Sequence, residues 1–339
     1  MITRTAPTWH TEDWQILLSG SIRSPEALWK RLELPLETLP AGLRGHQAFP
    51  VRVPEPYLDK IQPGRLDDPL LLQVLPVAAE SETVSGFVVD PLGERQANPQ
   101  SGLLHKYQSR VLLVLSGTCA VNCRYCFRRH FPYADNRLSS HEFDQVGAYL
   151  QAHPEVNEVI LSGGDPLVVS NARISSLLNL LENIPSVQRL RIHSRVPVVI
   201  PQRIDTGLLE ALAQTRLDVV LVTHSNHPRE LDAVFDAAMG ALRQAGVHLL
   251  NQAVLLRGVN DQADVLVALS ERLFQGGILP YYLHLLDPVA GAHHFDVPEA
   301  EARSLMAQLH RRLPGFLIPR LVREISGKPG KTLIDLHLS

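Results

Sequence analysis

Three closely spaced cysteines are the residues of this chain best suited to carry chemistry. Cys119, Cys123 and Cys126 form a C-x3-C-x2-C pattern, and they are the only cysteines in 339 residues. Thiolates are soft ligands that suit iron–sulfur clusters and zinc. Three of them on one short loop can hold three irons of a [4Fe–4S] cluster and leave the fourth iron open to a small molecule. Two alternatives stay open: three unrelated buried thiols, and a structural zinc site completed by His130.

A repeating pattern of strands and helices from residue 110 onward is expected to position this loop. Short apolar segments rich in β-branched residues alternate with amphipathic segments of helical length. Strands are predicted at residues 111–115, 158–161, 190–193, 219–222, 248–254 and 279–285, and helices at 139–153, 172–183, 204–214, 229–245 and 262–275. Successive β-α units predict a parallel sheet, and six are too few to close a barrel of eight strands. The predicted fold class is α/β, an open (β/α)6 partial TIM barrel with an N-terminal, mainly helical region.

Polar residues lie at the carboxyl ends of all six predicted strands. Because these ends meet at one edge of a parallel sheet, the polar groups should line a common site. They are the cysteine loop, Ser162-Gly163-Gly164-Asp165, His193-Ser194-Arg195, Thr223-His224, Asn251-Gln252 and Asp287. Their repetition at every strand predicts an active site at this edge.

The first third of the chain shows no pattern that indicates chemistry, so we expect a supporting or interface role for it. A helix start is predicted at Ser24-Pro25, where a capping serine precedes a proline, and Asp68-Pro69 precedes a short apolar run at 70–75. Residues 80–104 have no sustained period and are predicted to form an extended connection. Three segments are predicted: an N-terminal region at 1–100, a core at 101–290 and a C-terminal segment at 291–339.

The composition is that of an ordinary globular protein, with 45% hydrophobic and 20% charged residues. A net charge of −3 gives no general attraction to nucleic acid or to an anionic membrane. Residues 1–14 lack the apolar core of a signal peptide, and no apolar stretch is long enough to span a bilayer. Since three clustered cysteines are no disulfide framework, we expect a cytoplasmic protein.

Several longer stretches resemble a known enzyme family. The cysteine spacing is similar to that of the radical S-adenosylmethionine enzymes, and FRRHFPY, LSGGDPL, RIHSRVPVVIPQRI, THSNHP and NQAVLLRGVND resemble the lysine 2,3-aminomutases. The resemblance covers residues 80–339. It implies three cofactors: a [4Fe–4S] cluster, S-adenosyl-L-methionine and pyridoxal 5′-phosphate (PLP). It also implies a radical reaction that moves a nitrogen from the α- to the β-carbon of an amino acid.

The glycine-rich element after the second predicted strand is expected to bind S-adenosylmethionine. Glycine lets the backbone approach a ligand closely, although a plain strand-to-helix turn is the alternative interpretation. The element resembles the GGE-type element of the superfamily, in which the backbone and the acidic residue hold the amino group of this cofactor. The residues that the resemblance assigns to S-adenosylmethionine are Ser162, Gly163, Gly164, Asp165, His224 and Gln252.

The resemblance places the PLP-bearing lysine near the C-terminus. Lys331, in the segment EISGKPGK, matches the lysine that bonds to the cofactor aldehyde. Lys328 is its competitor, because GKPGK replaces the family's glycine run. Lys331 lies seven positions after Glu324, which is the family's spacing, so we favour Lys331. The residues expected at the PLP phosphate and ring are Arg110, Lys106 and Tyr107.

Three further residues are assigned to the substrate by the same resemblance. Arg128 matches the arginine that binds the substrate carboxylate, for which a guanidinium fork is suited, whereas the adjacent Arg129 is expected to be solvated. Asp287 and Glu324 match two acids that bind the distal ammonium of lysine. Two buried acids without a cation would repel and raise one pKa. A lysine substrate removes this cost, and a glutamate substrate would increase it.

The resemblance therefore implies conversion of L-α-lysine to (R)-β-lysine. The chain ends eight residues after Lys331, whereas clostridial-type enzymes carry an added C-terminal segment. GLLHKY and CAVNCRYCFRRHFPY resemble the bacterial branch that serves elongation factor P, in which a separate ligase attaches β-lysine. We expect an electron donor protein, a functional link to such a ligase, and a homo-oligomer. The alternatives are an aminomutase for another amino acid, a radical enzyme without PLP, and a non-catalytic zinc-binding module.

Overall fold

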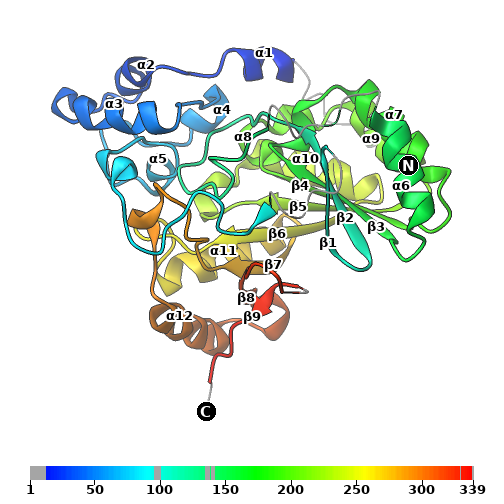
Figure 1. Cartoon of the computed structure of the whole chain (residues 1–339). Coiled ribbons are helices and arrows are strands. Elements are labelled where there is room, and N and C mark those ends of the chain that lie inside the picture. The colour runs from blue at the N-terminus through cyan, green and yellow to red at the C-terminus, as the bar shows by residue number, and fades with distance from the viewer. Residues whose placement is uncertain (1–12, 95–100, 134–137, 139–141, 329, 338–339) are drawn as a thin grey trace, which may run out of the picture.

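A nine-stranded sheet forms the centre of the protein, as seen in a computed structural model that describes residues 13–94, 101–133, 138, 142–328 and 330–337. Residues 1–14, in which we expect no signal peptide, lie mostly outside the described part of the chain. The start of the helix predicted at 139–153 and part of the connection predicted at 80–104 also lie outside it. The spatial order of the strands follows the chain (Figure 1). The strands are β1 (Leu103–Tyr107), β2 (Arg110–Ser116), β3 (Glu158–Gly163), β4 (Arg189–Ser194), β5 (Asp218–His224), β6 (His248–Val254), β7 (Leu279–His284), β8 (Arg320–Arg323) and β9 (Thr332–Leu333).

The sheet is parallel from β2 to β8, and β1 and β9 pair antiparallel at its two edges. Among the described strands β1 does not pair with β9, so the sheet is open. The six predicted strands correspond to β2–β7, which confirms the open α/β fold. The sequence did not predict β1 and β8, because the short segments LLHKY and RLVR carry charged residues and no apolar run.

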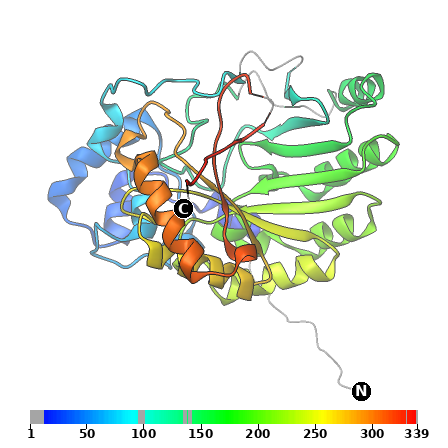
Figure 2. The same cartoon turned by 90° about the horizontal axis from the view of Figure 1, so that it is seen from below.

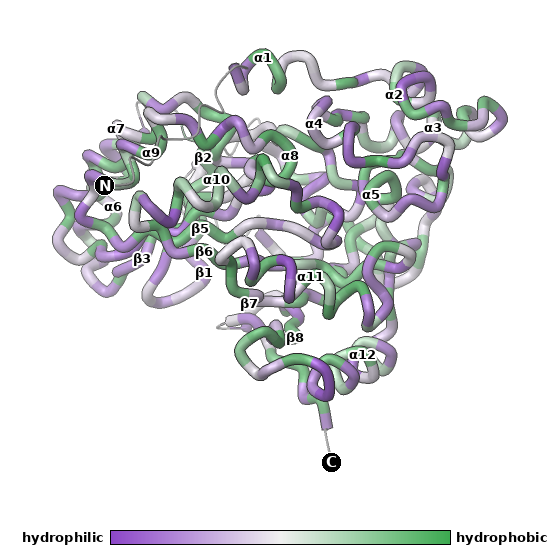
Figure 3. The backbone as a smooth tube through the Cα atoms, turned by 180° about the vertical axis from the view of Figure 1, so that it is seen from behind, coloured by the Kyte–Doolittle hydropathy of each residue, from purple (hydrophilic) through white to green (hydrophobic). Residues whose placement is uncertain are grey.

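Helices surround the outside of the curved sheet (Figure 2). In α7, for example, the buried residues Ile174, Leu177, Leu178 and Leu181 recur every three or four positions and form one face. Hydrophilic and hydrophobic residues accordingly alternate along the outer helices (Figure 3). These helices are α6 (Phe143–Ala152), α7 (Asn171–Glu182), α8 (Val196–Val199), α9 (Thr206–Gln214), α10 (Ala233–Gln244), α11 (Ala263–Gln275) and α12 (Glu299–Arg312). No helix in the described part of the chain is long and apolar enough to cross a membrane.

One predicted helix, at 229–245, begins later than expected. A single 3-10 turn at Pro228–Glu230 comes first, and α10 starts after Asp232, whose side chain accepts a hydrogen bond from Phe235 N. The proline therefore opens a separate turn, and the aspartate caps the helix. The helix ends at Gln244, close to its predicted limit at 245, and the following Gly246 has a φ of 83°, a conformation that favours glycine.

Five α-helices precede β1 in the described part of the N-terminal region, and α4 (Glu55–Leu58) contacts α8. The predicted cap at Ser24 is confirmed, since its side chain accepts from Ala27 N, and the structure adds a cap at Asp68, whose side chain accepts from Leu70 N. Lys60 Nζ in this region donates to Val198 O in α8 over 3.1 Å. Buried side chains of both parts form one continuous cluster, and the three predicted segment boundaries stay a prediction. The helices are α1 (Trp14–Ser19), α2 (Pro25–Arg31), α3 (Leu39–Ala48), α4 (Glu55–Leu58) and α5 (Pro69–Leu72).

Candidate active site

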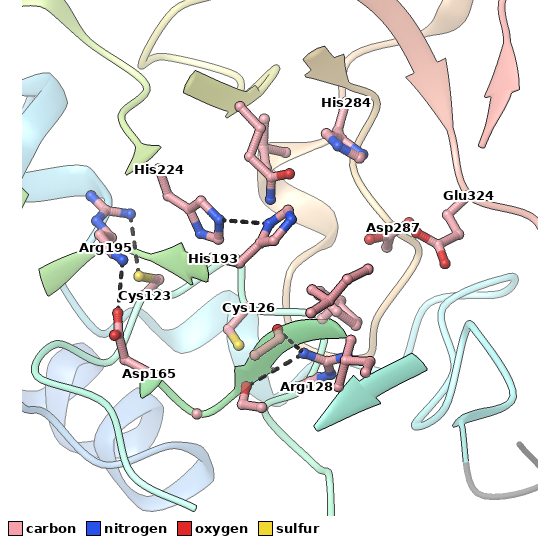
Figure 4. Close-up of a pocket in the computed structure, with 18 of the residues that line it drawn as sticks. Cys123, Cys126, Arg128, Asp165, His193, Arg195, His224, His284, Asp287 and Glu324 are labelled. Carbon is pink, nitrogen blue, oxygen red and sulfur yellow. Dashed lines mark hydrogen bonds between the residues drawn. The ribbon is translucent and has the colours of Figure 1, made fainter. Parts of the chain in front are cut away.

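A single cavity of about 300 Å³ at the carboxyl ends of the strands collects every residue that the sequence assigned to a cofactor or to the substrate (Figure 4). These residues come from the cysteine loop after β2, the ends of β3 and β5, β6, and segments near both edges of the sheet. All six predicted strand ends contribute to the cavity, although Ser194, Thr223 and Asn251, which were also expected there, do not line it. The individual roles stay predictions. The assigned residues in the cavity wall are Lys106, Tyr107, Arg110, Cys119, Cys123, Cys126, Arg128, Ser162, Gly163, Gly164, Asp165, His224, Gln252, Asp287, Glu324 and Lys331.

The cysteine loop is fastened to the N-terminal region through the residues between its cysteines. Asn122 N donates to Arg52 O over 3.0 Å, and Arg124 N donates to Gln73 O over 2.9 Å. Arg124 is fully buried, and its guanidinium donates to both carboxylate oxygens of Glu80. The N-terminal region therefore holds the backbone of the loop, while the three cysteines line the cavity.

The three thiols are ligands that suit an iron–sulfur cluster or zinc. In the part of the chain that the structure describes, no three His, Cys, Asp or Glu side chains converge as one ion requires. His130 Nε2 instead lies 3.0 Å from Ala290 O, so the zinc alternative gains no support. Burial, with the other thiols adding to its effect, raises the pKa of Cys119 well above its usual value and that of Cys126 to about 11. Thiolates here need an added positive charge, which cluster irons would provide.

Gly163 and Gly164 allow the end of β3 to cross the cysteine loop closely. A Cβ atom on Gly164 would lie 2.4 Å from Thr118 O, and Gly163 has a φ of 109°. A side chain at either position would collide or be strained. Packing between two parts of the chain thus already requires both glycines, whether or not a ligand also approaches them.

The carboxylate of Asp165 is satisfied within the chain. It accepts hydrogen bonds from Ser194 Oγ at 2.7 Å and from the backbone N–H groups of Leu167, Arg195 and Val196. Burial raises its pKa, although these four donors oppose the rise. The structure gives Asp165 a role in orienting the turn after β4, and its contact with S-adenosylmethionine stays a prediction.

One wall of the cavity consists of uncharged histidines. His224 Nε2 lies 3.4 Å from His193 Nδ1. Burial, followed by nearby positive charges, lowers the pKa of His224 to about 3 and those of His193 and His284 well below the usual value. Within the described residues, Gln252 Oε1 and His284 Nε2 are buried without a hydrogen-bond partner. Buried polar atoms are normally paired, so this wall fits a ligand that carries polar groups. S-adenosylmethionine and PLP both carry such groups.

Glu94 occupies the guanidinium fork of Arg128. Its carboxylate accepts from Arg128 Nε at 2.6 Å and from Nη2 at 2.7 Å, and Lys106 Nζ lies 3.1 Å from it. Arg128 Nη1 donates to Ser162 Oγ over 2.8 Å. A role for Glu94 was not predicted, because a single glutamate in a segment without periodicity gives no signal. The predicted carboxylate-binding arginine therefore already has a carboxylate partner from its own chain.

The prediction that Arg129 is solvated is wrong. Its side chain is only 1% exposed, and it donates to Glu80 Oε2 over 2.6 Å and to Gly291 O over 2.8 Å. Glu80 also binds Arg124, so one buried carboxylate holds two arginines of the cysteine-loop region. The sequence placed Glu80 in a segment without a predicted role, and for that reason its buried partnership was not foreseen.

Asp287 and Glu324 lie close together in the cavity (Figure 4). Burial, with the charge of Glu324 as the next cause, raises the pKa of Asp287 to about 7. Burial would raise the pKa of Glu324 as well, but the Lys331 ammonium, 2.7 Å from Oε2, outweighs it and lowers that pKa. Tyr107 Oη donates to Glu324 Oε1 over 3.1 Å. The expected repulsion between the two acids is thus present, and Lys331 supplies a cation to one of them.

Lys331 and its neighbours form the part of the cavity expected to bind PLP. Lys331 lines the cavity directly before β9, whereas Lys328 is exposed and lies outside the cavity wall. The Arg110 guanidinium lies over the Tyr107 ring, 4.2 Å from its centroid. A lysine amine, an aromatic ring and the positive charges of Arg110 and Lys106 are the groups that a phosphorylated aldehyde requires, so these residues fit PLP.

Comparison with known proteins agrees with this arrangement of residues. The model of the Radical SAM superfamily matches residues 113–269, which include the three cysteines and the strands from β3 to β6. L-lysine 2,3-aminomutase of Haemophilus influenzae is 49% identical over 322 residues, covering 95% of each chain. The enzyme of that name from Escherichia coli is 48% identical over 339 residues, covering 100% of this chain and 98% of its own. The one from Clostridium subterminale is 35% identical over 321 residues, covering 94% of this chain and 77% of its own. The chain therefore belongs to the lysine 2,3-aminomutase family, a family of isomerases within the radical S-adenosylmethionine superfamily.

Proposed function

We propose that this protein is a lysine 2,3-aminomutase that converts L-lysine to (R)-β-lysine. The observation that carries the proposal is one cavity that combines Arg128 with the acid pair Asp287 and Glu324. An arginine and two acids match the carboxylate and the distal ammonium of lysine. Relatives named L-lysine 2,3-aminomutase, at 48% and 49% identity over nearly the whole chain, support the same activity.

The cysteine side of the cavity would hold the iron–sulfur cluster and S-adenosylmethionine. Cys119, Cys123 and Cys126 would bind the cluster, and Gln252 Oε1 offers a free buried acceptor to the second cofactor. Together these cofactors supply a radical that removes a hydrogen from the substrate. His224 is uncharged at neutral pH, so it would add no positive charge beside a sulfonium ion.

The C-terminal side of the cavity would hold PLP. Lys331 Nζ would bond to the cofactor aldehyde, and Arg110 and Lys106 would face its phosphate. PLP supplies a π-system that stabilises a radical on the substrate. Tyr107 connects this group to the acid pair, since its hydroxyl donates to Glu324.

The acid pair would select a substrate with a distal ammonium group. Lys331 forms an ion pair with Glu324 in the absence of ligands, and it could not keep this contact unchanged if it bonded to a cofactor aldehyde. Lys106 would then be the remaining cation that acts on both Asp287 and Glu324, and a substrate ammonium would relieve the excess negative charge. A glutamate side chain would add a third negative charge, so glutamate should be excluded.

We further propose that the product modifies elongation factor P through a separate ligase. The support is the resemblance of GLLHKY and CAVNCRYCFRRHFPY to the bacterial branch with this role. A cytoplasmic location, a low-potential electron donor protein and a homo-oligomeric state belong to the same proposal. Detection of β-lysine on elongation factor P in cells that carry the gene, and its loss on deletion, would test this role.

The catalytic proposal is tested by anaerobic reconstitution with iron, sulfide, S-adenosylmethionine and PLP, followed by assay against lysine, glutamate, ornithine and arginine. We expect turnover of lysine and none of glutamate. Asp287→Ala should lower kcat/KM for lysine about a hundredfold, because a buried charge-assisted contact contributes roughly 2–3 kcal/mol. Iron content and PLP binding should persist in this variant.

Two results would contradict the proposal. Preferred turnover of a different amino acid would favour the alternative of an aminomutase for that substrate. Turnover without PLP, or the absence of a PLP absorption band from protein with full iron content, would favour a radical enzyme that does not use PLP. Lys328→Ala is the control for the assignment of PLP to Lys331, since Lys328 is exposed outside the cavity wall. This variant should behave as the wild type.

A further inference from the structure

A buried arginine contacts one of the three cysteine sulfurs. Arg195, in the turn after β4, is 5% exposed, and its Nη1 donates to Cys123 Sγ over 3.2 Å (Figure 4). This distance suits a hydrogen bond to sulfur. Arg195 is one of the polar residues predicted at the strand ends, without an individual role.

The guanidinium of Arg195 is held in place from its other side. Its Nη2 donates to Gln73 Oε1 over 2.8 Å and contacts Tyr57 Oη at 3.4 Å and Glu230 Oε2 at 3.5 Å. The backbone N–H of Arg195 donates to Asp165 Oδ2 over 2.7 Å. With both its backbone and its guanidinium fixed, Arg195 can aim Nη1 at a sulfur atom without paying much conformational entropy.

Two of these partners belong to the N-terminal region. Gln73 and Tyr57 are both fully buried, and Gln73 makes contacts with several parts of the site. Its Nε2 donates to Glu230 Oε1 over 2.9 Å, its Oε1 accepts from Asn226 Nδ2 at 3.0 Å, and its backbone oxygen accepts from Arg124 N in the cysteine loop. A single glutamine therefore links the N-terminal region to both the cysteine loop and the arginine beside it.

We propose that Arg195 is a positioning residue that raises the reduction potential of the cluster, and that Gln73 of the N-terminal region holds it in place. The cluster accepts one electron from a low-potential one-electron donor, and in this step no bond forms and no proton moves. An N–H donor and a positive charge next to a cluster ligand stabilise the added negative charge. The inference rests on the family and on the Cys123 contact, and it holds whichever amino acid is the substrate.

The test is a redox titration of the reconstituted cluster, with titanium(III) citrate as reductant and electron paramagnetic resonance as readout. S-adenosylmethionine, PLP and lysine are left out, so substrate identity does not enter the result. Arg195→Gln should make the midpoint potential more negative by at least 59 mV, a tenfold change in the one-electron equilibrium. Arg195→Lys and Gln73→Leu should shift it in the same direction by less, since each keeps the charge but loses the fixed geometry.

Arg203→Gln is the matched control, because Arg203 is also fully buried but donates to the backbone oxygens of Leu167 and Val169 and contacts no cysteine. It should leave the potential unchanged. An Arg195→Gln protein with full iron content and the wild-type potential would overturn the proposal, even if it bound S-adenosylmethionine poorly. Should that variant take up no cluster, Arg195→Lys and Gln73→Leu decide the question, and wild-type potentials in both would overturn it equally.

Discussion

Replacing Asp287 by asparagine should stabilise the PLP-free protein at pH 8 while it removes most of the lysine turnover. Asp287 lies in the cavity beside Glu324, and burial together with that charge raises its pKa to about 7. Above this pH the folded protein holds two negative charges at the acid pair, which Lys331 in direct contact with Glu324 and Lys106 farther away balance only in part. Asparagine keeps the size of the side chain and removes one of these charges.

The size of the effect follows from the two pKa values of Asp287. The folded state has a value of about 7 and an ordinary aspartate has 3.8, so the folded state binds the proton more tightly. The free energy of unfolding therefore falls as the pH rises from about 4 to about 7. A difference of about 3 between the pKa values corresponds to about 4 kcal/mol. Because water enters the open cavity and screens part of the repulsion, we expect a gain of about 2 kcal/mol from Asp287→Asn at pH 8.

Thermal unfolding at pH 5 and at pH 8 measures this gain in protein that contains the cluster but neither PLP nor lysine. The variant should unfold a few degrees above the wild type at pH 8, and the difference should shrink at pH 5. Asp264→Asn is the control, because its side chain is 85% exposed and its replacement should have the same small effect at both pH values. A variant that is less stable than the wild type at pH 8 would refute the assignment of a strained acid pair.

Three further results are expected. Protein purified anaerobically should contain about four irons per chain after reconstitution, and Cys126→Ala should lose the cluster; stoichiometric zinc without iron would contradict the cluster assignment. Borohydride should fix PLP on Lys331, so that Lys331→Ala loses the PLP absorption band and turnover while Lys328→Ala keeps both; a peptide map with the adduct on Lys328 would reverse that assignment. Glu94→Gln should lower the free energy of unfolding by about 3 kcal/mol, since it leaves the Arg128 charge buried without its partner. PLP and lysine should reduce this loss in thermal unfolding, and an equal loss with and without them would show that neither ligand reaches Arg128.

The elements that were predictable from the sequence are those whose pattern is local. Apolar, β-branched runs predict the strands β2–β7, and a single apolar face predicts helices such as α7. The common edge of the strand ends then follows from parallel topology alone. The strands β1 and β8 carry no such pattern. Each forms by pairing with a neighbouring strand, β1 with β2 and β8 with β7, and such pairing is not visible in the local sequence.

The unpredicted part of the site consists of contacts between residues far apart in the chain. Glu94 and Glu80 each meet their arginines only after the N-terminal region folds across the cysteine loop. Nothing in the residues around them marks a buried acid, since glutamate is normally exposed. Gln73 is a stronger case, because an amide in a short apolar run gives no sign that it will contact an arginine beside a cysteine.

Both cations that the proposed ligands need are paired within the chain before any ligand arrives. Arg128 is bound by Glu94, and Lys331 is bound by Glu324. These pairs avoid the cost of isolated buried charges, but they also couple the two binding events. If Lys331 bonded to the aldehyde of PLP, it could not keep its present contact with Glu324, while the repulsion between Glu324 and Asp287 would remain and Lys106 would be the other cation that acts on them. Lysine should therefore bind more tightly to the PLP-loaded protein than to the PLP-free protein, and the acid pair should discriminate between substrates best in the loaded protein.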